Sequence, residues 1–98
     1  MLLPKHIQSI VAKRYRVTRA ELLGRRRLPH LVLSRHVAML LTLEMVRGAS
    51  LQQVGLWFNR HHTTVLAARE RMHRELARDK GFAREVEELR RRLISKAG

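Results

Sequence analysis

Cysteine is absent from this sequence, and aromatic residues make up only 4% of it. The first absence excludes disulfide bridges and thiolate metal sites, which suits a reducing compartment. Prolines and glycines are also few, at 2 and 5, whereas Leu, Ala, Arg and Glu abound. Such a composition favours helices over sheet, and 98 residues suit one small domain. We therefore expect residues 1–98 to form a single all-α domain.

Acidic residues are scarce. The sequence has 8 Asp and Glu against 21 Lys and Arg, which gives a formal net charge of +13 and a pI near 11.9. A chain of this charge repels itself unless it meets a polyanion, so nucleic acid is the natural partner. Residues 1–69 carry 12 basic and 2 acidic residues, while residues 70–98 carry 9 and 6. The binding face should therefore lie in the first two thirds of the chain.

Long apolar runs and enzyme signatures are missing as well. No run approaches the length of a membrane span, and the start MLLPKHIQ lacks the apolar region of a signal peptide. The sequence has no G-x-x-x-x-G-K-[ST] phosphate loop, and its 6 histidines form no H-E-x-x-H zinc motif. We expect a protein of the cytoplasm and nucleoid that is not an enzyme and uses no metal, nucleotide or other cofactor. The start at Met1 and the compact first helix favour a free-standing small protein over an excised domain.

Apolar residues recur at helical spacing through the first part of the chain. Pro4 suits the first turn of a helix that should run roughly to Tyr15. Thr18 and Glu21 form a capping box, which predicts a short second helix before Gly24.

Three consecutive arginines, Arg25, Arg26 and Arg27, follow in the segment GRRRLPHLVL. Because a proline cannot continue a helix, we interpret this segment as a surface loop. Its arginines either form a solvated charge run or reach phosphates and the minor groove, whose negative potential attracts Arg. After the loop, Ser34 is expected to cap a long buried helix that ends at Gly48.

A polar cluster then separates two helical patterns in the segment SLQQVGLWFNRHHTTVLAARERM. Ser50 and Gln53 form a second capping box that opens one helix, and Asn59 makes the turn. A new apolar stripe that begins at Val65 places residues 61–64 in the first turn of the next helix. Two helices joined by so tight a turn predict a helix-turn-helix, whose second helix enters the major groove with its N-terminus first.

The first turn of that second helix carries side chains suited to reading DNA, namely His61, His62, Thr63 and Thr64. Thr hydroxyls and His nitrogens can donate and accept at base edges or phosphates, and free helix amides attract phosphate. The alternative is that the two threonines only cap the helix. Exposed aromatic platforms for stacking RNA bases are missing, so double-stranded DNA is favoured over RNA.

The tail GFAREVEELRRRLISK predicts a final amphipathic helix, because its apolar residues form one stripe at Phe82, Val86, Leu89 and Leu93. This stripe is too short for a dependable coiled coil. We therefore expect the helix to pack on its own domain rather than to form a dimer.

The helix-turn-helix segment also resembles a known family. SLQQVGLWFNRHHTTVLAA is similar to S-L-x-x-I-G-x-x-F-G-x-R-D-H-T-T-V-x-x-A, the approximate signature of the C-terminal DNA-binding domain of the bacterial DnaA replication initiators. Upstream, IQSIVAKRYRVTRAELLGRRR and SRHVAMLLTLE are similar to the first helices, the basic loop and the long helix of that family. The resemblance covers roughly Ile7 to Ala68. It implies a compact domain of about six helices with a helix-turn-helix of the Trp-repressor type.

For function, the resemblance implies binding of a monomer to a short asymmetric box in double-stranded DNA, in replication initiation or its regulation. In the family, an arginine of the basic loop enters the minor groove, and the match is Arg27. Arg35 and His36 match a pair of DNA contacts in the long helix, and residues 60–64 match the segment that reads the major groove. The full set of expected DNA contacts is Arg25, Arg26, Arg27, Arg35, His36, Ser50, Leu51, Gln52, Arg60, His61, His62, Thr63 and Thr64.

The sequence departs from the family at the segment that reads bases. His61 stands where the family carries Asp, so an acceptor-only side chain is replaced by one that can donate. The turn FNRHH is one residue shorter than usual, and the link RGAS is one residue longer. The alternative function is therefore a stand-alone transcriptional regulator that reads a different DNA site, and a weaker alternative is an RNA-binding module.

Overall fold

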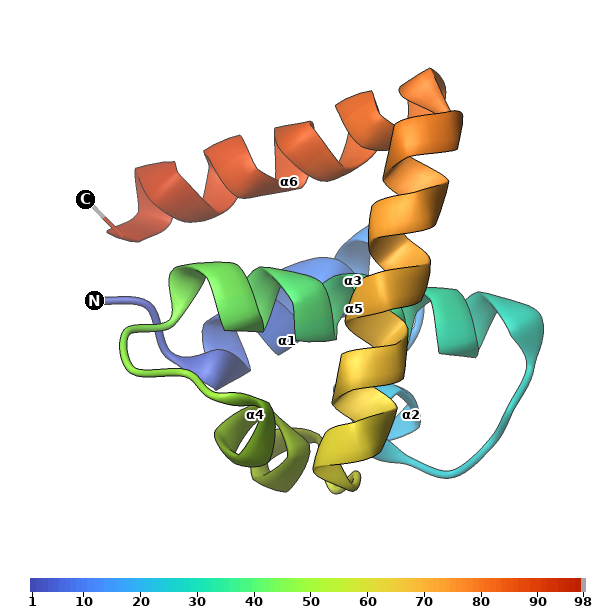
Figure 1. The fold of residues 1–98 in the computed structure, drawn as a ribbon. Coiled ribbons are helices and arrows are strands. Elements are labelled where there is room, and N and C mark those ends of the chain that lie inside the picture. The colour runs from blue at the N-terminus through green and yellow to red at the C-terminus, as the bar shows by residue number, and fades with distance from the viewer. Residues whose placement is uncertain (98) are drawn as a thin grey trace.

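Six helices and no strand make up the part of the chain that the computed structural model describes, residues 1–97 (Figure 1). The prediction of an all-α fold is confirmed. The helices are α1 (Pro4–Arg14), α2 (Arg19–Leu23), α3 (Pro29–Met45), α4 (Leu51–Phe58), α5 (His62–Arg78) and α6 (Lys80–Ala97). Within these residues, no helix is both long enough and apolar enough to cross a membrane.

Helix α3 is the central element, and it packs against α1, α2, α4 and α5. Its middle is apolar on nearly every side, and all five residues from Val37 to Leu41 are buried. A helix that is buried all round needs apolar residues on every face, as this sequence supplies. The same segment was expected to form the buried helix of the domain, and this expectation is confirmed.

Helix α6 closes the domain by packing against α5 and α1, as Figure 1 shows along the upper edge of the molecule. Val86, Leu89 and Leu93 are buried, so the predicted apolar stripe faces the domain's own core. Two ion pairs hold α6 in place: Glu85 lies 3.1 Å from Arg14, and Arg90 lies 2.8 Å from Glu44.

The start of α3 differs from the sequence-based expectation. The helix begins at Pro29, five residues before Ser34. A proline breaks a helix only in its interior; at the first helical position its missing N–H costs nothing and its fixed φ suits the helix. Ser34 is therefore not a cap but a buried residue of the helix, and its hydroxyl donates to the carbonyl of Leu31 at 2.9 Å. The basic loop is shorter than predicted as a result.

The expected caps and boundaries are otherwise largely present. The capping box of α2 is complete, because the Thr18 hydroxyl accepts from the amide of Glu21 while the Glu21 carboxylate accepts from the amide of Thr18. At α4 only half of the predicted box forms: the Ser50 hydroxyl accepts from the amide of Gln53 at 3.1 Å, without the reciprocal bond. Helix α3 ends at Met45, slightly before the predicted end at Gly48.

The turn between α4 and α5 is tight enough to need special residues. Asn59 adopts a left-handed conformation with φ of 56°, which Asn tolerates better than most side chains. The amide of Arg60 donates to the carbonyl of Gly55 at 2.8 Å, which draws the turn against α4. A Cβ on Gly55 would lie 2.5 Å from the carbonyl oxygen of Arg60, so only glycine fits this approach.

Candidate nucleic-acid interface

The first turn of α5 is presented outward, while the rest of the helix anchors it in the core. His61 is the N-cap residue and is exposed, as are Thr63 and Thr64. Buried residues on the opposite face, Val65, Ala68 and Met72, fix the helix against the domain. The polar side chains at the start of α5 are therefore accessible on a rigid support.

The basic loop lies beside this turn. Arg25, Arg26 and Arg27 are all exposed. A depression of about 320 Å³ is lined by the loop, by α3 and by the start of α5, and its polar lining residues are Arg25, Arg27, Arg35, His36, Asn59, Arg60, His61 and Thr64. None of them is acidic. Segments far apart in sequence are thus gathered into one positively charged, carboxylate-free surface, which is the type of surface that binds a polyanion.

Arg35 lies in a different place from the one expected of a DNA contact. The residue is only 5% exposed. Its guanidinium donates to the carbonyl of Leu22 at 2.6 Å, to that of Glu21 at 3.1 Å and to that of Arg26 at 3.3 Å. In this conformation Arg35 connects α2 to the basic loop, because its guanidinium donates hydrogen bonds to carbonyls at the end of α2 and inside the loop.

Arg60 has a similar arrangement. One of its terminal nitrogens donates to the carbonyls of Phe58 at 3.2 Å and Asn59 at 3.1 Å, and the other donates to the carbonyl of Gly24. The planar fork of an arginine suits such a task, since its donors point in fixed directions. Arg60 thereby joins the turn of the helix-turn-helix to the start of the basic loop.

Neither Arg35 nor Arg60 forms an ion pair with a carboxylate among residues 1–97. Burial lowers the pKa of Arg35, and the positive charges of Arg60 and Arg27 lower it further. Burial also lowers the pKa of Arg60, with Arg25 and Arg27 adding to the effect. Like charges held together at such a site repel one another, and a phosphate nearby would relieve that repulsion.

His36 is half-buried beside these arginines, on the face of α3 that looks toward α5. Burial lowers the pKa of His36, and the positive charges of Arg71 and Arg35 lower it further. It lines the same depressions as Arg27 and Thr64, so the structure brings this expected contact to the site.

The expected contacts at the start of α4 form a separate group. Ser50 and Gln52 are exposed and Leu51 is half-buried, but none of them lines the depressions that contain Arg27. Helix α4 nevertheless lies next to the start of α5, at the same end of the molecule (Figure 1). His62 is half-buried, and its ring lies 4.3 Å from that of His61.

Arg71 and Arg74, which were not among the predicted DNA contacts, lie on the same surface as Arg27 and Thr64. A depression of about 450 Å³ is lined by Arg27, His36, Thr63, Thr64, Ala67, Ala68, Arg71 and Arg74. Arg71 and Arg74 are exposed on α5, beyond the first turn. The spacing of Thr64, Ala67, Arg71 and Arg74 at three- and four-residue steps is the signal that would have found them, because such residues share one helix face.

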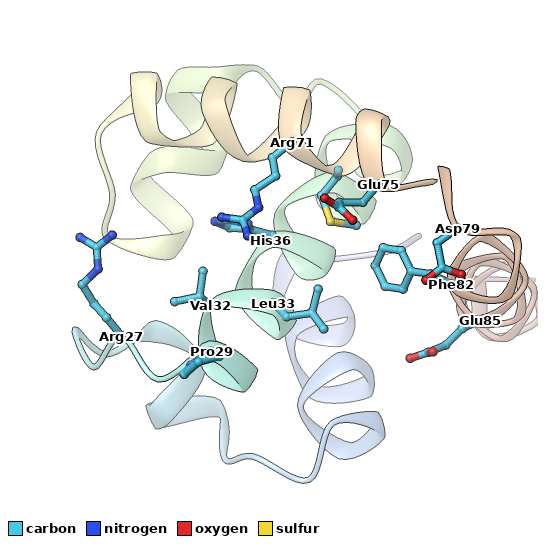
Figure 2. Close-up of a pocket in the computed structure, with 11 residues that line it drawn as sticks. Arg27, Pro29, Val32, Leu33, His36, Arg71, Glu75, Asp79, Phe82 and Glu85 are labelled. Atoms are coloured by element: carbon cyan, nitrogen blue, oxygen red, sulfur yellow. Dashed lines mark hydrogen bonds between the residues drawn. The ribbon is translucent and has the colours of Figure 1, made fainter. Parts of the chain in front are cut away.

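A change of charge marks the edge of this surface. A third groove, of about 620 Å³, has Arg27, His36 and Arg71 toward one end (Figure 2). Toward the other end are the carboxylates of Glu75, Asp79 and Glu85, which come from the end of α5, the turn after it and α6. A polyanion would be repelled there, so the surface that attracts one extends from the basic loop to the middle of α5.

A short helix, a left-handed turn and a longer helix with an exposed polar start are the parts of a helix-turn-helix, and this domain is of that class. Residues 4–72 match the family described as the bacterial DnaA protein helix-turn-helix. The chain belongs to this family. It is a family of helix-turn-helix domains, not of catalytic ones.

Full-length relatives agree with this assignment. The chain is 40% identical over 90 residues to the chromosomal replication initiator protein DnaA of Latilactobacillus sakei, an alignment that covers 91% of this chain and 20% of that protein. It is 41% identical over 88 residues to the DnaA protein of Rhodopseudomonas palustris strain BisB18, with 89% and 18% covered. The DnaA protein of Caldanaerobacter subterraneus is 35% identical over 89 residues, with 91% and 20% covered. The chain thus spans about a fifth of the length of these relatives.

Proposed function

We propose that residues 1–98 form one domain that binds double-stranded DNA in a sequence-specific way and acts in replication initiation or its regulation. The observation that carries the proposal is the shared, carboxylate-free surface of the basic loop and the exposed first turn of α5. Membership of the DnaA helix-turn-helix family supports the choice of partner.

In this mechanism, the start of α5 enters the major groove, where Thr63, Thr64 and the two histidines before them meet base edges. Arg27 lines the same depression as both threonines and reaches the neighbouring phosphates or minor groove. Arg71 and Arg74 continue the contact along the backbone. One copy of the domain binds an asymmetric site, as the family resemblance implies.

Arg35 and Arg60 act differently from the contacts that the family resemblance implies. Because their guanidiniums are occupied by backbone carbonyls, they hold the loop and the turn at a fixed separation. A fixed separation matters, since the loop and α5 address different features of one duplex at the same time. Preorganisation of this kind reduces the entropy lost on binding.

The test is a fluorescence-anisotropy titration of a labelled duplex at several salt concentrations. If about 6 phosphates are neutralised, log K should fall against log salt with a slope near −5. Arg26→Ala should weaken binding to all duplexes nearly alike. Thr64→Ala should instead reduce the discrimination between sites by about 1–3 kcal/mol. Arg92→Ala is the matched control, because Arg92 is exposed on α6, away from the proposed surface.

A response that does not change with salt, or an Arg92→Ala variant as impaired as Arg26→Ala, would overturn the proposal. The site itself is found by selection from random duplexes. Recovery of the initiator box would indicate action together with the initiator or against it. Recovery of an unrelated palindrome would indicate a dimeric transcriptional regulator.

RNA is a weaker candidate because the aromatic side chains are not arranged as a stacking platform. Phe58 is buried, and Tyr15, Trp57 and Phe82 are half-buried against the core. Recognition of single-stranded RNA relies on exposed aromatic rings on which bases stack. Titration with a single-stranded RNA of the same length provides the comparison, and we expect weaker binding than to duplex DNA.

A further inference from the structure

His61 has a defined hydrogen-bonding polarity, which follows from its position as the N-cap of α5. Its Nδ1 lies 3.3 Å from the backbone nitrogen of Thr63 and 2.8 Å from the Thr63 hydroxyl oxygen. A backbone N–H can only donate, so Nδ1 must accept and carries no proton. The neutral ring therefore carries its proton on Nε2, because one of the two nitrogens must be protonated.

The protonated nitrogen is available to a ligand. His61 is exposed, and Nε2 makes no hydrogen bond to any residue within 1–97. The ring is held by its two contacts to Thr63, and its centroid lies 4.3 Å from that of the His62 ring. It also lines the depression that contains Arg25 and Thr64. A hydrogen-bond donor is thus held in a restricted orientation on the proposed DNA surface.

We propose that His61 determines base specificity by donating from Nε2 to an acceptor in the major groove, with guanine as the preferred base. This inference rests on the proposed function. Guanine presents two adjacent acceptors in the major groove, N7 and O6, whereas cytosine presents only the N4 donor. The related motif carries Asp at this position, and a carboxylate can only accept. His61 therefore reverses the polarity of this contact, and the preferred site should differ from the initiator box at the base pair it meets.

The test uses two nearly isosteric substitutions that both preserve the cap. In His61→Asn, the side-chain oxygen accepts from the Thr63 amide and the NH₂ group donates outward. In His61→Asp, one oxygen caps the helix while the other accepts from the ligand. Asn and Asp are equally good N-caps, and Asp also complements the helix dipole, so both variants should fold. Their melting curves serve as the check.

Selection from random duplexes is carried out with the wild type and both variants. We expect the wild type and His61→Asn to select guanine at one position where His61→Asp selects cytosine or adenine. At that position, guanine is then replaced by 7-deazaguanine, which lacks N7, or by 2-aminopurine, which lacks O6. One of these analogues should weaken binding of the wild type and of His61→Asn about fivefold, as loss of one hydrogen bond does, and leave His61→Asp unaffected.

The same base selected at every position by all three proteins would overturn the inference. A wild type insensitive to both analogues at every guanine would also overturn it. In either case duplex binding itself is retained, so the proposed function stands. If the wild type binds no duplex more tightly than it binds a polyanion without bases, such as heparin, the proposed function itself is refuted.

Discussion

Gly55→Ala tests whether the close approach of α4 to the turn sets the position of α5. In an ordinary helix this change stabilises by about 1 kcal/mol, because glycine is the poorer helix former. Here the added Cβ would lie 2.5 Å from the carbonyl oxygen of Arg60, which is backbone and cannot rotate away. Forcing extra atoms into such a site costs about 1–3 kcal/mol.

The steric cost should exceed the gain in helix propensity, because the turn cannot easily move away: the Arg60 amide donates to the Gly55 carbonyl at 2.8 Å. We expect a net loss of up to about 2 kcal/mol, and each kcal/mol lost lowers Tm by about 4–8 °C in a domain of this size. The added Cβ should also displace the turn and with it the start of α5. Binding to the preferred duplex should therefore weaken relative to binding to nonspecific duplex.

Gly81→Ala is the matched control. Gly81 also lies in a helix, but its added Cβ would meet only the Asp79 carboxylate oxygen, at an ordinary contact distance of 3.4 Å. This variant should gain up to about 1 kcal/mol from helix propensity alone. Both Tm values are measured by circular dichroism. A Gly55→Ala variant as stable as Gly81→Ala would show that the close approach at Gly55 imposes no strain on a side chain.

Three further predictions concern the charged groups of the site. Arg60→Lys should lower Tm by several degrees, because a point charge cannot serve carbonyls on two segments at once, whereas Arg26→Lys should leave Tm unchanged; equal melting curves would contradict the bracing role. The lowered pKa of His36 means that the folded state binds its proton less well than the unfolded state, so the free energy of unfolding should fall as the pH drops below about 6.5. His36→Gln should flatten this part of a pH series of urea titrations, and an unchanged slope would count against it. Arg71→Ala should reduce the salt slope of duplex binding by about 1, as expected for one lost phosphate contact, while Arg92→Ala leaves it unchanged.

Most of the fold could be predicted because periodicity and caps are local signals. A few residues of sequence are enough to recognise the apolar stripes of α1, α5 and α6 and the capping box at Thr18. The predicted start of α3 was wrong for an equally local reason. A proline can end one helix or begin another, and the arginines before Pro29 favoured the first interpretation.

The roles of Arg35 and Arg60 could not be predicted, since they depend on contacts between distant segments. Arg60 reaches the carbonyl of Gly24 across 36 positions, and Arg35 reaches that of Leu22 across 13. A sequence pattern shows a conspicuous arginine but not which carbonyls will surround it. The exposure of residues in the first turn of α5 was easier to predict, because the apolar stripe on the opposite face of the helix determines the direction in which they point.

A ¹H–¹⁵N NMR titration of the protein with its selected duplex locates the DNA-binding surface residue by residue. We expect the largest amide shift changes in two segments, residues 25–27 and residues 60–64, with smaller changes around Arg71 and almost none in α6 beyond Glu85. Shift changes concentrated on α6, or spread evenly over the domain, would contradict the assignment of the DNA-binding surface.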